Sequence, residues 1–366
     1  MKVKSQLAQS VLVYRLGSLG DTIAALPVFN KIVEVFPGAD ITLLTNKPIA
    51  AKAAAIEAVL GQGYFFKRTI NYPIGTRNPL LLFKLLVDIR KQKPTVVCYL
   101  AGVRGDDNIR KAKLTLLRDR FFFRLAGVKM FIGFPKVIED IKLSVDAQTG
   151  DFEWEPKRLA RRFAAIGKID LNAEEAWRLH FTPEEENAAN KIIVDSGVET
   201  PFIAISTGTK HQTNNWEQHN WIELISLLGK TLQGWHLVIF GAAEEADEAD
   251  LCVAAWGQHG VNLCGKTSPR VSAVLMQRAS IFLGHDSGPM HLAASVGTPC
   301  VCVFSARHFP RQWYPRGVNN KIIYHKTDCA GCQKEICVTQ QKRCILSISP
   351  YEVYNAVVEV LKFNIN

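Results

Sequence analysis

The chain has 366 residues, of which 48% are hydrophobic and 21% are charged. This length suits two domains of ordinary size, and the composition excludes disordered and fibrous classes of protein. The formal net charge of +10 favours phosphate-bearing ligands or an anionic membrane surface as partners, although a single Lys or Arg is more often a solvated surface residue.

The positive charge is concentrated in the N-terminal half. Seven basic residues face a single acid over residues 67–93, and ten basic residues face five acids over residues 104–142. The apolar stretch at 11–14 is too short for the core of a secretory signal. We therefore expect a cytoplasmic protein that touches the inner face of the cytoplasmic membrane peripherally.

Strands and helices are predicted to alternate in the first half of the chain. The first strand covers residues 11–14 and leads through a glycine-containing turn into a helix over 22–35. Further strands are predicted at 41–45 and 95–100, and further helices at 52–60, 79–93 and 114–125. This order is the β-loop-α-β unit of a parallel sheet.

The pattern weakens over residues 150–183, which we interpret as an inter-domain region with a basic helix at 157–166 and a short strand at 179–183. Strands then follow at 202–206, 236–240, 281–283 and 300–304, and helices at 184–196, 221–232, 244–256, 271–279, 290–296 and 350–361. The fold class is therefore α/β, with two Rossmann-like, doubly wound domains that face each other across a cleft. We expect an N-terminal domain over 1–178, a C-terminal domain over 179–348, and a terminal helix over 349–366 that packs back on the N-terminal domain.

A first candidate site is the turn that follows the first predicted strand. Gly17 and Gly20 permit a tight backbone close to a ligand. Asp21 stands where the strand passes into a helix, and from this position alone it is a capping or first-turn acid rather than a catalyst. The turn has neither the Gly-x-Gly-x-x-Gly pattern nor a Walker loop, which disfavours dinucleotide and P-loop sites.

A second candidate site lies in the segment Gly-His-Asp-Ser-Gly-Pro-Met-His, directly after another predicted strand. Pro289 suits the first turn of a helix, so free N–H groups and the positive end of the helix dipole favour a diphosphate around Ser287 and Gly288. Asp286 suits a sugar hydroxyl or an amide. His291 lies one turn further on and can face the ligand, although a lone histidine is more often structural.

Two other turns carry polar residues after predicted strands. Thr207, Thr209 and Lys210 can hold phosphate oxygens through hydroxyl groups and a point charge. After another strand, one of the two acids Glu244 and Glu245 suits the role of a strand-end carboxylate that binds a ribose hydroxyl pair. For both turns, a capping role is equally expected when the turn is taken alone.

Four of the nine cysteines lie within sixteen residues, in the pattern Cys329-x2-Cys332-x4-Cys337-x6-Cys344. Thiolates are favoured ligands of zinc and iron, and the first pair has ligand spacing, so a structural metal is chemically reasonable. The spacing of the second pair is irregular for a zinc ribbon, and free thiols stay an alternative. The other five cysteines are expected to be reduced and buried.

Several of these features together resemble the family 9 glycosyltransferases, the ADP-heptose:lipopolysaccharide heptosyltransferases, in the same order and over nearly the whole chain. They are residues 17–22 with Pro27, the segment with Trp216 and Trp221, residues 284–294 and the cysteine cluster. The resemblance implies the GT-B fold, inversion at the anomeric carbon and no catalytic metal. In one departure, Asn214 stands where many members carry a lysine, and Lys210 can supply that charge instead.

The resemblance also implies roles for individual residues. Asp21 matches the family's general base, and residues 207–210 match its phosphate-binding turn. Glu245 matches the ribose-binding acid more closely than Glu244 does. The donor-site loop is matched by Asp286, Ser287, Gly288 and His291. A branch of the family that glycosylates autotransporters uses cysteines to hold iron, and the cluster here is similar to that arrangement.

The predicted function is the inverting, metal-independent transfer of heptose from ADP-heptose to a lipopolysaccharide inner-core acceptor. Asp21 would take the proton from the acceptor hydroxyl, while the helix start near Ser287 and Lys210 would offset charge on the departing nucleotide diphosphate. Arg15 and Arg104 are the predicted contacts to the anionic, lipid-linked acceptor. No catalytic cofactor and no nucleic acid partner are expected. The alternatives are another nucleotide sugar, for O-antigen or protein glycosylation, and a non-catalytic nucleotide-binding scaffold.

Overall fold

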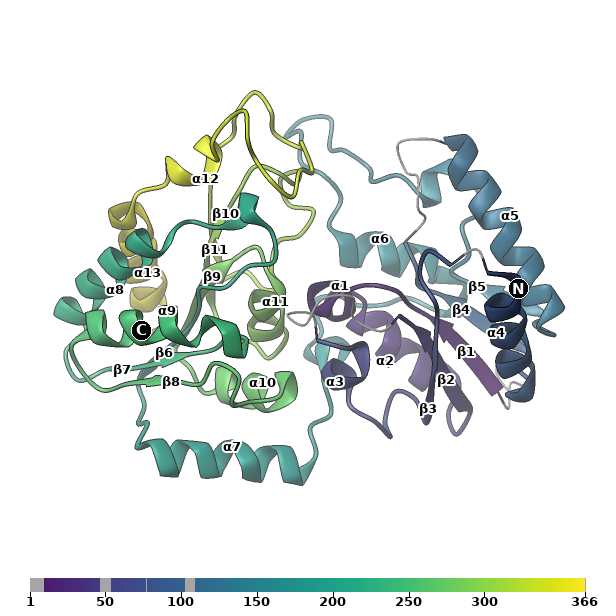
Figure 1. Cartoon of the computed structure of the whole chain (residues 1–366), viewed down its shortest axis with the longest axis horizontal. Coiled ribbons are helices and arrows are strands. Elements are labelled where there is room, and N and C mark those ends of the chain that lie inside the picture. The colour runs from purple at the N-terminus through teal and green to yellow at the C-terminus, as the bar shows by residue number, and fades with distance from the viewer. Residues whose placement is uncertain (1–9, 47–53, 77, 103–108, 366) are drawn as a thin grey trace. The chain divides into compact units, whose positions relative to one another are not determined.

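A computed structural model describes residues 10–46, 54–76, 78–102 and 109–365 of the chain. It divides into two compact units, Met1–Arg178 and Leu179–Asn366. Each unit has one parallel sheet with helices on both faces (Figure 1). The prediction of two parallel-sheet α/β domains is therefore confirmed. Among the helices that the structure describes, none combines the length and the apolar character needed to cross a lipid bilayer.

The first unit contains a five-stranded sheet in the order β3-β2-β1-β4-β5. Its strands are β1 (Ser10–Tyr14), β2 (Asp40–Thr45), β3 (Arg68–Asn71), β4 (Val96–Tyr99) and β5 (Met130–Ile132). Its α-helices are α1 (Leu19–Ala24), α2 (Leu26–Val35), α3 (Ile56–Leu60), α4 (Pro79–Lys91), α5 (Ile109–Leu125) and α6 (Glu155–Arg162). Side chains of β1, β4, α4 and α5 share one buried cluster, so α4 and α5 cover the same face of the sheet.

Two features of the first unit differ from the sequence prediction. The single helix expected over 22–35 is two helices, because Pro27 lies in the first turn of α2 and has no N–H to continue the ladder of α1. The strands β3 and β5 were not predicted. Both are short and lie at the edges of the sheet. The side chains of β3 are all at least partly exposed, and the apolar run of β5 has only three residues.

The second unit contains a six-stranded sheet in the order β11-β10-β9-β6-β7-β8. Its strands are β6 (Phe202–Ser206), β7 (His236–Ile239), β8 (Gly260–Asn262), β9 (Ile281–His285), β10 (Cys300–Phe304) and β11 (Lys321–Tyr324). Its α-helices are α7 (Pro183–Ser196), α8 (Gln218–Thr231), α9 (Ala246–Trp256), α10 (Pro269–Gln277), α11 (Gly288–Ser295), α12 (Arg343–Leu346) and α13 (Pro350–Ile365). One face of the sheet packs against α8, α9 and α13, while α11 contacts β9, β10 and α10.

One expectation for the second unit needs correction. Residues 179–183 form no strand, and Thr182 instead caps the start of α7. The terminal helix α13 belongs to the core of the second unit. It contacts α8, β10 and β11, because Val353, Val357 and Leu361 form an apolar stripe that is buried there.

The order of the strands determines where each unit can bind a ligand. In the second unit the chain runs from β6 outward to β7 and β8, and then returns to β9 on the other side of β6. The direction of winding therefore switches between β6 and β9, where Ser206 pairs with Gly284. The first unit has the same switch between β1 and β4. Ligands of doubly wound sheets bind at this point, outside the carboxyl ends of the strands.

Candidate functional site

The loop after β9 carries buried polar atoms at the start of a helix. Ser287 is the N-cap of α11, and Pro289 lies in the first turn of that helix. Asp286 Oδ2 and Ser287 Oγ are buried and have no hydrogen-bond partner among the described residues. A buried polar atom without a partner costs about 1–3 kcal/mol, and the hydroxyl groups of a ligand would satisfy both atoms.

The environment of Asp286 keeps its carboxyl group largely protonated below neutral pH. Burial raises the pKa of Asp286 to about 7, and the positive charge of Arg307 opposes this rise. Arg307 follows β10 and donates to the carbonyl oxygens of Lys334 at 3.0 Å and Gln333 at 3.1 Å. Sequence reasoning missed Arg307. The available signal was a basic residue three positions after the end of a predicted strand.

Asn214, the departure from the family pattern, connects two loops at this edge of the sheet. Its side chain is buried, and its Nδ2 donates to the carbonyl oxygen of Asp286 at 3.1 Å. Ser305 Oγ, at the end of β10, donates to Asn214 Oδ1 at 2.6 Å. Asn214 therefore holds the backbone of the predicted donor-site loop and adds no charge. Lys210 is exposed, four residues before it.

The carboxylate of Glu245 lies against the turn that follows β6. Its Oε2 accepts from the N–H of Ala242 at 2.9 Å. A Cβ atom added to Gly208 would lie 2.0 Å from Glu245 Oε1, and one added to Gly241 would lie 2.5 Å from Oε2. A side chain at either position would therefore displace the carboxylate from this place. Glu244 is exposed, so the geometry favours Glu245 as the acid of this site.

The remaining predicted donor-site residues lie on the same edge. Thr207 is buried and Thr209 is partly buried, directly after β6, which pairs with β7 and β9. His291 is buried in α11, with its ring 6.2 Å from that of Trp313. The second unit thus brings together the predicted turns after β6, β7 and β9. At the end of β9, His285 accepts from the N–H of Trp216 at 3.2 Å, and burial lowers the pKa of His285 to about 4.

In the first unit, Asp21 is the acid in the first turn of α1, and Ser18 is the N-cap. Asp21 Oδ2 accepts from both the N–H and the hydroxyl group of Ser18, each at 2.9 Å. Its Oδ1 lies 3.7 Å from Arg15 Nη2, and the side chain is 35% exposed. Gly17 has a φ of +148°, and a Cβ there would lie 2.6 Å from Asp21 Cβ. The turn therefore fixes the carboxylate while leaving part of it accessible.

Of the two predicted acceptor contacts, only Arg15 lies within the described residues. Arg15 is buried at the switch between β1 and β4, where it donates to the carbonyl oxygens of Leu100 at 2.7 Å and of Asp21. Burial lowers the pKa of Arg15, and the charge of Asp21 opposes this effect. Its hydrogen bonds fit a residue that positions Asp21. Arg104 lies outside the described residues.

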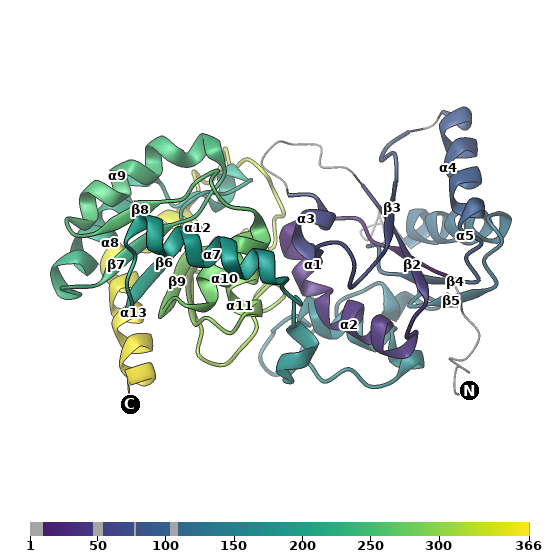
Figure 2. The same cartoon turned by 90° about the horizontal axis from the view of Figure 1, so that it is seen from below.

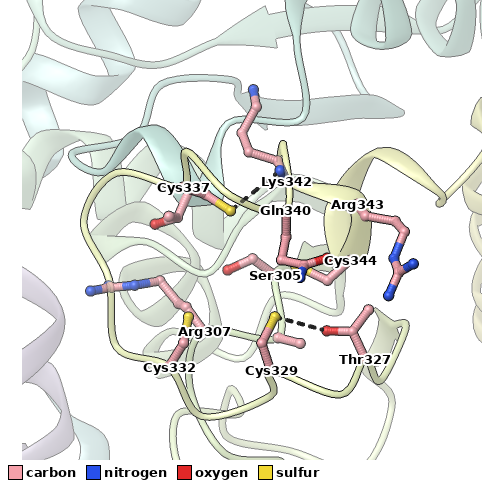
Figure 3. Close-up of a pocket in the computed structure, with 12 residues that line it drawn as sticks. Ser305, Arg307, Thr327, Cys329, Cys332, Cys337, Gln340, Lys342, Arg343 and Cys344 are labelled. Carbon is pink, nitrogen blue, oxygen red and sulfur yellow. Dashed lines mark hydrogen bonds between the residues drawn. The ribbon is translucent and has the colours of Figure 1, made fainter.

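The four clustered cysteines line one pocket of the second unit (Figure 3). Thr213, Ser305 and Arg307 also line it, and Ser305 connects the pocket through Asn214 to the carbonyl oxygen of Asp286. Burial raises the pKa of Cys344, and the charges of the other three thiols add to this effect. Within the described parts of the chain, however, no three His, Cys, Asp or Glu side chains are arranged to hold a metal ion.

Comparison with known proteins gives a consistent result. A family model described as glycosyltransferase family 9 (heptosyltransferase) matches residues 115–343. The chain is 26% identical over 136 residues to lipooligosaccharide heptosyltransferase 2 of Campylobacter jejuni, and this match spans 36% of this chain and only 42% of that protein. It is 22% identical to the lipopolysaccharide core heptosyltransferase OpsX of Haemophilus influenzae, over 88% of this chain and 86% of that protein.

A solved structure shares the fold. The ADP-heptose LPS heptosyltransferase II of E. coli superimposes with a TM-score of 0.62 and 16% identity, over 98% of this chain and 100% of that chain. The two doubly wound units are therefore those of a GT-B fold, as predicted. Because the family model covers more than half of its residues, this chain belongs to glycosyltransferase family 9.

Proposed function

We propose that this chain transfers heptose from ADP-heptose to a lipopolysaccharide inner-core acceptor, with inversion and without a catalytic metal. The observation that carries the proposal is the edge after β6, β7 and β9. There, two buried polar atoms without partners among the described residues, Asp286 Oδ2 and Ser287 Oγ, lie at a helix start beside the switch in the sheet. The two relatives compared above are heptosyltransferases, and the similar E. coli structure is that of an ADP-heptose LPS heptosyltransferase.

In this proposal, the second unit binds the donor. The N–H groups at the start of α11 and the ammonium group of Lys210 hold the diphosphate. Glu245 accepts hydrogen bonds from the ribose hydroxyl pair, in keeping with its position after β7. Asp286 and His291 contact the sugar, since a carboxyl group that is protonated near neutral pH can both donate to and accept from hydroxyl groups.

The first unit supplies the base and binds the acceptor. The acceptor oxygen attacks the anomeric carbon, its proton passes to Asp21 Oδ1, and the bond from that carbon to the diphosphate oxygen breaks as ADP leaves. Arg15 keeps Asp21 in place through its two backbone hydrogen bonds. Charge on the departing diphosphate is offset by the helix start and Lys210, which removes the need for a metal ion.

Replacement of Asp21 by Asn tests the assignment of the base. We expect transfer to fall by at least about a hundredfold, the lower range for general-base catalysis, while binding of the donor is unchanged. The measurements are release of ADP with a purified lipid-linked acceptor, in the presence of EDTA, and the anomeric configuration of the product by NMR. Glu57→Gln is the matched control, because Glu57 is the first-turn acid of the short helix α3 in the same unit. Undiminished transfer by Asp21→Asn would refute the assignment.

A thermal-shift screen of nucleotide sugars tests the identity of the donor. A ligand at one hundred times its dissociation constant stabilises the folded state by about 2.7 kcal/mol. A response to ADP-heptose, with none to UDP- and GDP-sugars, supports the proposal. A response to UDP- or GDP-sugars alone would replace the donor, and binding without any transfer would favour the non-catalytic scaffold.

We further propose that the enzyme works at the inner face of the cytoplasmic membrane. Its proposed acceptor is anionic and lipid-linked, and the net charge of +10 is complementary to such a substrate and to anionic lipids. Fractionation of cells that produce the chain tests this location. Recovery with inner membranes that is lost in high salt is expected, whereas recovery in the soluble fraction alone would contradict it.

We also propose a structural zinc or iron ion at Cys329, Cys332, Cys337 and Cys344. The chemistry of the ligand set fits, since four thiols line one pocket, but their present arrangement does not, so the side chains must turn to bind the ion. Metal analysis of the protein purified without chelators should find one ion per chain. Cys332→Ser should lose it, and Cys264→Ser, outside the cluster, should keep it. A metal-free wild-type protein would overturn this proposal.

A further inference from the structure

The helix α5 has two apolar faces, and one of them is exposed. Leu116 and Phe123 are buried against the sheet. On the opposite face, four large apolar side chains recur at intervals of three or four residues and form one stripe along the helix. They are Leu114, Leu117, Phe121 and Leu125, which are 66%, 65%, 65% and 46% exposed. An ordinary surface helix would carry polar residues at these positions.

The helix α4 shows the same pattern on the same side of the first unit. Leu85 and Ile89 belong to the buried cluster that α5 joins, whereas Leu80 and Phe83 are 76% and 64% exposed. Figure 2 shows α4 and α5 on the same side of the sheet of the first unit. We call the exposed stripe of α5 together with Leu80 and Phe83 the outer apolar surface.

Basic residues surround the outer apolar surface. The helices α4 and α5 contain nine Lys and Arg residues and two acids. Both acids are paired, since Asp88 lies 3.5 Å from Lys91 and Asp119 lies 2.6 Å from Arg118. On α5, the helical spacing places Lys111 and Arg118 on one flank of the stripe, and Lys113, Arg120 and Arg124 on the other. The outer apolar surface is therefore an apolar strip between two positive borders.

We propose that the outer apolar surface docks on an anionic phospholipid bilayer. The leucine and phenylalanine side chains enter the boundary between headgroups and acyl chains, while the flanking Lys and Arg side chains contact lipid phosphates. The proposal rests on the proposed function only in that a lipid-linked acceptor lies in such a membrane. A second copy of this chain fits the surface less well, because a symmetric contact would bring two positive borders together.

Vesicle flotation of the full chain tests this proposal. We expect binding to vesicles of phosphatidylcholine with phosphatidylglycerol, weaker binding at high salt, and little binding to phosphatidylcholine alone. The double variant Leu117→Gln/Phe121→Gln should bind at least about tenfold more weakly, since each exposed side chain loses part of its transfer free energy. The control Val194→Gln/Leu251→Gln removes two exposed apolar side chains from the second unit and should bind like the wild type. Melting temperatures verify that each variant is folded.

The result can be separated from the proposed transfer, because flotation uses no donor or acceptor. Wild-type binding that the Leu117/Phe121 variant leaves unchanged would overturn the docking surface, even if transfer to a detergent-dispersed acceptor proceeds. Loss of self-association in that variant, measured by sedimentation velocity, would overturn it in favour of a contact between copies. Flotation that depends on Leu117 and Phe121 would support it, even in a chain that transfers no sugar.

Discussion

Replacement of Asp286 by Asn should change how the stability of the second unit depends on pH. In the folded chain, burial raises the pKa of Asp286 from 3.8 to about 7. Between these two values the folded state binds a proton that the unfolded state has released, so this group makes stability fall as the pH rises. At 1.36 kcal/mol per pKa unit, this group lowers the free energy of unfolding by about 3 kcal/mol between pH 5 and pH 8. The amide that replaces the carboxyl group in Asp286→Asn does not titrate, so the variant should escape this loss.

The measurement is the melting temperature of wild type and Asp286→Asn at a series of pH values. For a unit of this size, about 3 kcal/mol corresponds to a shift of about 8 °C. The variant should therefore gain about 8 °C relative to wild type between pH 5 and pH 8, whatever its absolute stability. Glu244→Gln removes an exposed acid nearby and should show no such trend. A constant difference between Asp286→Asn and wild type across this range would refute the reasoning.

Three further predictions concern groups that the fold brings together. Gly208→Ala should weaken binding of ADP by at least about tenfold, because the new Cβ displaces the Glu245 carboxylate. Calorimetry measures the affinity, and an unchanged value would count against Glu245 as a ligand of the nucleotide. Asn214→Ala should destabilise the second unit by about 1–3 kcal/mol, because Ser305 Oγ loses its acceptor in the interior. Urea unfolding measures this, and a stability equal to that of the wild type would show that the link between the loops is dispensable. Arg15→Met should lower kcat and leave the KM for the donor unchanged, because Arg15 positions Asp21 in the first unit. A higher KM for the donor with an unchanged kcat would contradict this role.

The repeating part of the fold could be predicted from the sequence because its signals are local. Strands β6 and β10 are continuous apolar runs, and both were predicted with the bounds that the structure has. The edge strands β3 and β8 gave no such signal. In β8, all three residues of Gly-Val-Asn are only partly buried, and this segment is a strand because it pairs with β7. Pairing with a neighbour is a tertiary interaction that no short window of sequence contains.

The candidate donor site divides in the same way. Asp286, Ser287 and the helix start after them could be predicted, because a turn between a strand and a proline-containing helix is encoded within a few residues. The link from Ser305 through Asn214 to Asp286 joins residues up to 91 positions apart. The approach of Glu245 to Gly208 likewise joins the turns that follow two neighbouring strands. Sequence alone thus determined which side chains are present in each turn, whereas the order of the strands decided which turns meet, because side chains that are distant in sequence come together only when the sheet assembles.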